Sequence, residues 1–314
     1  MINRRALGAS LAAGLALAAL PGVGFAQDNA AQKLPVVASF SILADFVRQV
    51  GGDRVSVTPL VGPNGDAHVY SPTPADAKAM AGARLVVING LHLEGWLPRL
   101  IKSSGSKATV ATATKGIKPI ESAEEGHDAK GGHDHGHDDP HAWQSIANAR
   151  IYIANIRDAL DAADPAGKAS YDANAAAYLA KLDVVEGEVK AAVARIPAAR
   201  RKAITTHDAF GYFVKAYGVE FIAPQGVSTE SEASARDVAR IIRQIKAQKV
   251  PAVFLENVTN PRLIEQIAKE SGAKVGGTLY SDALSDASGP AGTYIDMMKH
   301  NISEIEKALA AGPA

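Results

Sequence analysis

Hydrophobic positions in the first third of the chain form two kinds of pattern in alternation. Short continuous apolar runs are typical of buried parallel strands, and longer stretches with apolar residues every three or four positions are typical of amphipathic helices. The expected strands span residues 35–40, 54–61, 85–89 and 110–112, and the expected helices between them span 41–50, 74–81 and 93–101. This alternation predicts an α/β lobe, with a parallel sheet and helices on both faces.

The last third of the chain repeats this pattern. The expected strands span residues 203–206, 220–223, 252–256 and 274–279, and the expected helices span 209–217, 234–248, 261–271 and 293–310. A second lobe of the same α/β kind is therefore predicted.

Between the two halves, residues 165–196 have no strand pattern and read as one long helix. Apolar residues recur at three- and four-residue spacing along a single face; they are Tyr171, Ala175, Tyr178, Leu182, Val185 and Val189. Asp164 is a good N-cap, Pro165 suits the first helical position, and Pro197 ends the pattern. About 32 residues of helix would extend roughly 48 Å, which predicts a stiff rod joining the two lobes.

The N-terminus has the features of a secretory signal peptide. Arg4 and Arg5 precede a short apolar run over residues 6–20, and small residues around Ala26 suit a signal peptidase. The run is shorter than the roughly 20 residues that span a bilayer, so we expect cleavage after Ala26, by either the general secretory or the twin-arginine route. The predicted division is a signal peptide (1–26), a first lobe (27–164) with a loop at 126–139, a linking helix (165–197) and a second lobe (198–314).

Composition narrows the possible functions. The 314 residues include 33 basic and 33 acidic side chains, and this balance argues against a nucleic-acid-binding protein. The chain contains no cysteine, which excludes disulfides, thiolate metal ligands and a cysteine nucleophile. It also leaves no cysteine for a lipid anchor, so we expect an unlipidated periplasmic protein. Any transition-metal site must use His, Asp or Glu.

The nine histidines fall into separate groups. One group alternates with carboxylates in the glycine-rich segment between residues 121 and 141, and consists of His127, His133, His135 and His137. Such a loop offers ligands for weak capture of a divalent cation, and the alternative is a solvated low-complexity loop. His92 and His300 are expected to lie at the surface.

Four further residues follow predicted strands. His68 lies in the turn after the second strand, His141 follows Asp139 and Pro140, His207 ends strand 203–206, and Asp282 lies just beyond strand 274–279. In parallel α/β sheets, ligands bind outside the carboxyl ends of strands. Each residue alone could be an ordinary polar loop residue. Two belong to each half of the chain, so a cleft between the lobes could bring all four together.

Five segments resemble a known family. They are residues 65–74 (GDAHVYSPTP), 89–96 (NGLHLEGW), 139–143 (DPHAW), 206–210 (THDAF) and 279–284 (LYSDAL). In this order they are similar to the solute-binding proteins of zinc and manganese ABC importers, and the match covers essentially the whole mature chain.

The resemblance implies two Rossmann-like lobes joined by one long helix, with the metal in the cleft between them. The ligands it implies are His68, His141, His207 and Asp282. It also implies a membrane permease and an ATPase as partners. A periplasmic metallochaperone is a further partner that the sequence leaves open, and we expect a monomer.

The donor set favours Zn²⁺ as the cargo. Three imidazoles and one carboxylate suit this borderline ion, whereas the manganese members that the chain resembles generally carry Glu where it has His207. Manganese or iron remains the alternative. Glu256, at the end of a predicted strand, either orients a ligand or is a surface carboxylate.

An enzyme is the competing class. Three histidines with an open position would resemble a hydrolytic zinc centre. The chain has no His-Glu-x-x-His motif and no nucleophile elbow, and Asp282 as a fourth ligand would close the site. We therefore expect no enzymatic activity. A metal-dependent adhesin that shares the fold is a third possibility.

Overall fold

The structure, a computed structural model, describes residues 33–121 and 138–310. The predicted signal peptide and the four loop histidines lie outside these residues. None of the helices in the described part of the chain is both long and apolar enough to cross a membrane.

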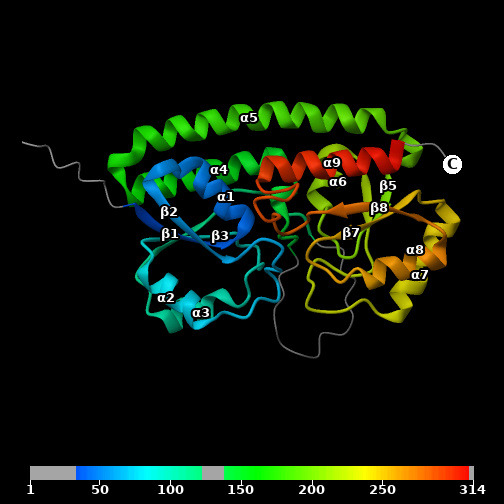
Figure 1. Cartoon of the computed structure of the whole chain (residues 1–314), viewed down its shortest axis with the longest axis horizontal. Coiled ribbons are helices and arrows are strands. Elements are labelled where there is room, and N and C mark those ends of the chain that lie inside the picture. The colour runs from blue at the N-terminus through cyan, green and yellow to red at the C-terminus, as the bar shows by residue number, and fades with distance from the viewer. Residues whose placement is uncertain (1–32, 122–137, 311–314) are drawn as a thin grey trace, which may run out of the picture. The chain divides into compact units, whose positions relative to one another are not determined.

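Two parallel sheets form the centres of two lobes (Figure 1). The first lobe has strands β1 (Leu34–Phe40), β2 (Val55–Val61), β3 (Leu85–Ile88) and β4 (Thr109–Thr112), in the order β2-β1-β3-β4. The second lobe has β5 (Lys202–Ile204), β6 (Glu220–Ile222), β7 (Ala252–Glu256) and β8 (Lys274–Leu279), in the order β6-β5-β7-β8. The two orders are equivalent, which confirms the prediction of two α/β lobes.

Helices follow the strands of each lobe as the periodicity predicts. They are α1 (Ser41–Gly51), α2 (Pro74–Gly82) and α3 (Leu97–Ser104) in the first lobe, and α6 (Gly211–Tyr217), α7 (Ala235–Gln248), α8 (Arg262–Ser271) and α9 (Tyr294–Ala310) in the second. Helix α3 begins later than the expected residue 93. Leu91 and His92 have positive φ values of 51° and 62°, and the chain makes turns there before the helix can begin.

Helix α4 (Ile146–Ala163) was not predicted from the sequence. Its buried residues follow helical spacing, which was the available signal; they are Ile146, Ala149, Tyr152, Ile153, Ile156 and Leu160. The long helix α5 (Lys168–Arg195) begins after a short 3-10 turn at Pro165–Gly167. Asp164 makes no capping hydrogen bond; its carboxylate instead accepts hydrogen bonds from Arg54 and Tyr171.

Helix α5 runs along both lobes (Figure 1) and contacts α1 and α4 on the first lobe and α6 and α9 on the second. The face predicted to be apolar is the buried one, from Tyr171 to Val189. Helix α9 lies beside α5, and its first residue, Tyr294, donates its backbone N–H to Asp45 of α1 over 2.9 Å. The lobes are thus linked by a long helix, with α9 packed along it.

Candidate metal centre

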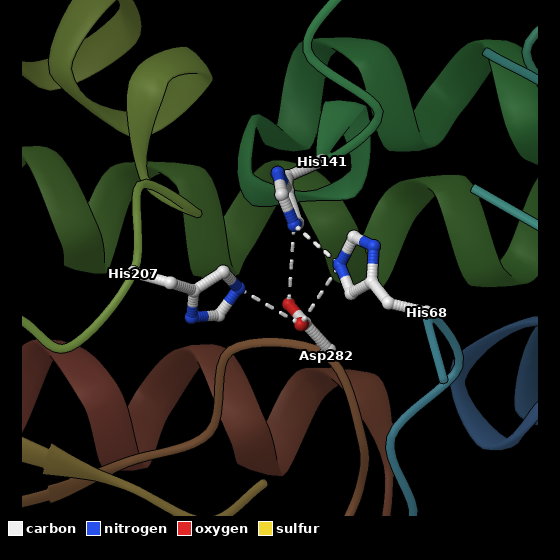
Figure 2. A group of neighbouring side chains, drawn as sticks. All are labelled: His68, His141, His207 and Asp282. Atoms are coloured by element: carbon white, nitrogen blue, oxygen red, sulfur yellow. Dashed lines mark hydrogen bonds and ion pairs between the residues drawn. The ribbon is translucent and has the colours of Figure 1, made fainter. Parts of the chain in front are cut away.

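The structure brings the four predicted side chains together, with their ligand atoms all within 4.8 Å of one another (Figure 2). The Nε2 atoms of His68 and His141 are 3.3 Å apart. From the Asp282 carboxylate, the nearest Nε2 distances are 3.0 Å to His207, 3.5 Å to His68 and 3.6 Å to His141. Around a tetrahedral ion with bonds of about 2.1 Å, donor atoms lie about 3.4 Å apart, so this spacing fits one cation.

Each of these residues lies on a segment that follows the carboxyl end of a strand. His68 follows β2, His141 follows β4, His207 follows β5 and Asp282 follows β8. Within the sheets, strand order reverses beside β1 and β5, which is where α/β sheets open a crevice for ligands. All four residues are buried, and only His68 retains slight exposure.

Asp139 fixes the orientation of His141. Its Oδ1 accepts the backbone N–H of His141 over 2.9 Å and lies 2.8 Å from Nδ1 of the same residue. The Tyr212 hydroxyl donates to the Asp139 carbonyl over 2.9 Å, and Oδ2 of Asp139 lies only 2.5 Å from the place that a Cβ on Gly211 would take. A proton held on Nδ1 leaves the lone pair of Nε2 directed at the site.

Glu256 occupies the corresponding place behind His207, where its contact with the ring is an ion pair that lacks the alignment of a hydrogen bond. Its Oε2 lies 2.6 Å from Nδ1 of His207. Its Oε1 accepts the backbone N–H groups of Thr206 and His207 over 2.6 and 3.0 Å. Glu256 is buried, so the alternative of a surface carboxylate is excluded and the orienting role is the one that fits.

The segment of Asp282 follows a strand of the second lobe, and residues of the first lobe hold the carbonyl directly before Asp282. The carbonyl of Ser281 accepts hydrogen bonds from Trp143 Nε1 over 2.9 Å and Gln144 Nε2 over 2.8 Å. Both donors follow His141 directly, in the short 3-10 helix Ala142–Gln144. Two of the four residues come from each half of the chain, and residues of both halves hold the backbone next to Asp282.

The charges of the site are strongly coupled. Burial alone would raise the pKa of Asp282, but the imidazoles of His207 and His141 hold it well below its usual value. Burial alone would lower the pKa of His207, but the carboxylates of Glu256 and Asp282 raise it well above its usual value. By hydrogen-bond geometry, no described residue donates to either carboxylate oxygen of Asp282. A divalent cation would take the place of the imidazole protons as the positive partner of this buried carboxylate.

A supporting network that the sequence analysis missed lies behind His141. Asn89 donates from Nδ2 to the Pro140 carbonyl over 3.0 Å and accepts from the Tyr152 hydroxyl over 2.6 Å. Glu94 accepts the backbone N–H of Asn89 over 2.6 Å. The resemblance had covered Asn89 and Glu94 in residues 89–96, but their role depends on contacts with distant residues.

The histidines outside the four-residue site differ in their exposure and contacts. His92 is exposed, as expected. His300 is half-buried, with its Nε2 3.0 Å from the Thr278 carbonyl and its ring packed against Tyr280. Asp138 and Asp139, assigned to the loop from sequence, are within the described structure, and Asp138 forms a β-bridge with Glu121. The loop histidines 127, 133, 135 and 137 lie outside the described residues.

Comparison with known proteins identifies the family. A model of the family described as ZnuA, the periplasmic component A of a zinc-uptake complex, matches residues 36–308. The chain belongs to the ZnuA family. Its members are non-enzymatic, extracytoplasmic metal-binding proteins of ABC importers, and this chain is the solute-binding component of a metal ABC importer.

Individual ZnuA-family relatives are named for different metals. The chain is 35% identical over 282 residues to the iron-binding protein YfeA of Yersinia pestis, covering 90% of this chain and 88% of that one. It is 31% identical over 292 residues to the manganese ABC transporter substrate-binding lipoprotein PsaA of Streptococcus pneumoniae, covering 91% and 92%.

A solved structure of the periplasmic zinc-binding protein TroA from Treponema pallidum matches with a TM-score of 0.81 at 31% identity, covering 89% of this chain and all of that one. A manganese-bound periplasmic metal-binding protein from Candidatus Liberibacter asiaticus matches with a TM-score of 0.78 at 32% identity, covering 88% of this chain and all of that one. Membership of the ZnuA family therefore establishes a divalent metal cargo, with manganese, iron and zinc all represented among the relatives.

Proposed function

We propose that this chain captures Zn²⁺ outside the cytoplasm and delivers it to the permease and ATPase of an ABC importer. The ion would be held by Nε2 of His68, His141 and His207 and by the carboxylate of Asp282. One observation carries the proposal: two of the three imidazoles have Nδ1 against a buried carboxylate, which directs each Nε2 at the site, where it binds a metal once it has lost its proton.

The donor set supports zinc over harder ions. Three nitrogens and one carboxylate match the preference of Zn²⁺, and a site closed by four protein ligands holds its ion rather than activating a water. Manganese or iron is the second candidate, supported by the relatives named for these metals. Oδ1 of Asp282 faces His141 and Oδ2 faces His207 and His68, so a bidentate carboxylate would offer a fifth donor atom to a harder ion.

The test combines metal analysis with ligand variants. Protein purified without chelator should carry about one zinc ion per chain, and zinc should outcompete added manganese. Replacing His68, His141, His207 or Asp282 by Ala should weaken zinc binding strongly, measured by competition with a chromogenic chelator. His92→Ala, at an exposed histidine, should leave the affinity unchanged. Wild-type affinity in all four site variants would contradict the assignment, and manganese or iron in the purified protein would favour the second candidate.

We further propose where the protein acts and with which partners. The N-terminal pattern supports export and cleavage after Ala26, and the absence of cysteine supports an unlipidated periplasmic protein. We propose that it acts as a monomer, with a periplasmic metallochaperone as an optional donor of the ion. Sequencing the N-terminus of the protein recovered from a bacterial periplasm tests the export step, and a mature protein beginning at residue 27 is the expected result.

A further inference from the structure

The backbone hydrogen bonds of the chain pass from second-lobe to first-lobe side chains immediately before Asp282. Asn301 of α9, in the second lobe, holds both backbone groups of Tyr280. Its Oδ1 accepts the Tyr280 N–H over 2.9 Å, and its Nδ2 donates to the Tyr280 carbonyl over 2.8 Å. One residue further on, the Ser281 carbonyl is bound by Trp143 and Gln144. Side chains of the second lobe therefore hold the backbone of Tyr280, and side chains of the first lobe hold that of Ser281.

Beyond Asp282, the Ala283 carbonyl accepts from Asn257 Nδ2 of the second lobe over 3.2 Å, and first-lobe residues hold Leu284. The backbone N–H of Leu284 donates to Ser41 Oγ over 2.9 Å. The Leu284 carbonyl accepts from the backbone N–H of Asn64, again over 2.9 Å. Asp282 is thus flanked on both sides by backbone groups that first-lobe residues hold in place.

Among the side chains that hold Ser281, Gln144 is a buried amide, and packing alone does not explain its presence. It is fully buried, and burial of an amide is costly unless its polar atoms are used. Its Nε2 donates to the Ser281 carbonyl, while its Oε1 has no hydrogen-bond partner among the described residues. The hydrogen bond from Nε2 to Ser281 is therefore what the buried amide provides.

That hydrogen bond acts on the peptide that carries Asp282. The Ser281 carbonyl belongs to the peptide unit whose nitrogen is that of Asp282, and this unit is planar. Fixing the direction of the carbonyl fixes the plane and with it the N–Cα bond of Asp282, so that the direction of its side chain then depends only on the rotations about φ and χ1. Because Gln144 lies just after His141 in one short 3-10 helix, the same element places both His141 and Asp282.

We propose that Gln144 is a positioning residue for the metal site: its amide, together with the Trp143 indole, holds the Asp282 carboxylate beside His141 and His68. This inference rests on the proposed function, because it assigns Gln144 a part in presenting a ligand. Gln144 touches no ion itself and acts only through the Ser281–Asp282 peptide.

The main test is Gln144→Leu, which keeps the volume of the side chain and removes its donor. Gln49→Leu is the matched control, because Gln49 of α1 also donates one Nε2 hydrogen bond, to Asp45. We expect Gln144→Leu to raise the apparent Kd for zinc about tenfold, in the range known for residues that orient metal ligands. The visible absorption spectrum of bound Co²⁺, which reports coordination geometry, should change as well. The control should alter neither readout, and the melting temperature of each metal-free variant checks folding.

A double-mutant cycle separates positioning from a general structural effect. In an Asp282→Ala background, Gln144→Leu should cause no further loss of Co²⁺ affinity, because the carboxylate it positions is gone. An equal further loss in that background, or a folded Gln144→Leu protein with wild-type zinc affinity and Co²⁺ spectrum, would overturn the proposal.

Two results would need a different reading: a Gln144→Leu protein that does not fold, and an Asp282→Ala protein that binds zinc normally. If Gln144→Leu does not fold, Trp143→Phe carries the same test, because it removes the other donor to Ser281 and keeps an aromatic ring against Phe40 and His141. If Asp282→Ala alone binds zinc as tightly as the wild type, the proposed ligand set fails instead, and the role of Gln144 falls with it.

Discussion

Glu256 holds His207 at two points, with Oε2 2.6 Å from the ring Nδ1 and Oε1 accepting the backbone N–H over 3.0 Å. Asp139 holds His141 in the same way, through its ring Nδ1 and its backbone N–H. One histidine from each half of the chain is therefore held in a single orientation, with Nε2 facing the site, before any ion arrives. This pre-organisation should increase affinity, because the imidazoles lose little freedom on binding.

Replacing the orienting carboxylate of His207 should weaken metal binding while preserving the fold. In Glu256→Gln, the amide oxygen can still accept the backbone N–H groups. The amide NH₂ would then face Nδ1 and favour the tautomer that carries its proton on Nε2, where the metal must bind. We expect the zinc Kd to rise about 10- to 100-fold, measured by chelator competition. Glu121→Gln, at an exposed carboxylate, is the control, and an unchanged Kd in Glu256→Gln would show that the contact does not orient the ligand.

The pH dependence of stability should differ between the metal-free and zinc-bound proteins. In the metal-free protein, the Glu256 and Asp282 carboxylates outweigh burial and raise the pKa of His207 well above its usual value. Its contribution to folding is fully present below the unfolded value near 6.5 and is lost as pH rises through the folded pKa. Zinc binds only the neutral imidazole. The zinc-induced rise in melting temperature should therefore be larger at pH 7.5 than at pH 5, and larger still at more alkaline pH.

Thermal denaturation with and without zinc between pH 5 and 9 measures this effect. His207→Gln is the matched control, because it removes the titrating group, and its metal-free melting temperature should depend less on pH in the alkaline range. The pKa of Asp282 is shifted the opposite way, well below its usual value. Its contribution to stability is present above the unfolded value near 3.9 and is lost as pH falls through the folded pKa. An equal zinc-induced shift at all pH values would contradict histidine ligation.

The His-rich loop should be dispensable for tight zinc binding, provided that the deletion ends before Asp139. Removing residues 126–137 leaves 122–125 to join Glu121 to Asp138, which already pair in a β-bridge. This variant should keep one tightly bound zinc and lose only weak extra ions, counted by titration. Removing 126–139 also deletes the carboxylate that binds His141 and should weaken the tight site about tenfold or more. Equal affinities in the two deletions would show that Asp139 is not needed.

Changing the donor at position 207 should shift the metal preference. His207→Glu adds an oxygen ligand, which suits a harder ion such as Mn²⁺. It is best made together with Glu256→Gln, so that two buried carboxylates do not face each other. We expect the ratio of manganese to zinc affinity to rise by about tenfold, measured by metal competition, with Glu256→Gln alone as the control. An unchanged ratio would mean that the imidazole of His207 does not set the preference.

The sequence alone was sufficient to predict the features that depend on residues close together along the chain. Periodicity alone predicted the two parallel sheets and the buried face of α5, because a residue's place in a helix or strand follows from its nearest neighbours along the chain. The four candidate ligands were predicted because each lies at a strand end, where parallel sheets bind ligands, and because five short motifs resemble one family. The misplaced start of α3 followed from positive φ angles at Leu91 and His92, which the apolar pattern does not encode.

The tertiary structure decided which distant groups support those ligands. Glu256 contacts His207 across 49 residues and Gln144 binds Ser281 across 137, and no local pattern links such pairs. The lobe that holds Asp282 was likewise decided by tertiary contacts: the chain order assigns Asp282 to the second lobe, but hydrogen bonds from the first lobe fix the peptide before it. A local sequence restricts backbone conformation, whereas the partner of a buried polar group is fixed only when the folded chain closes around it and leaves no water to take its place.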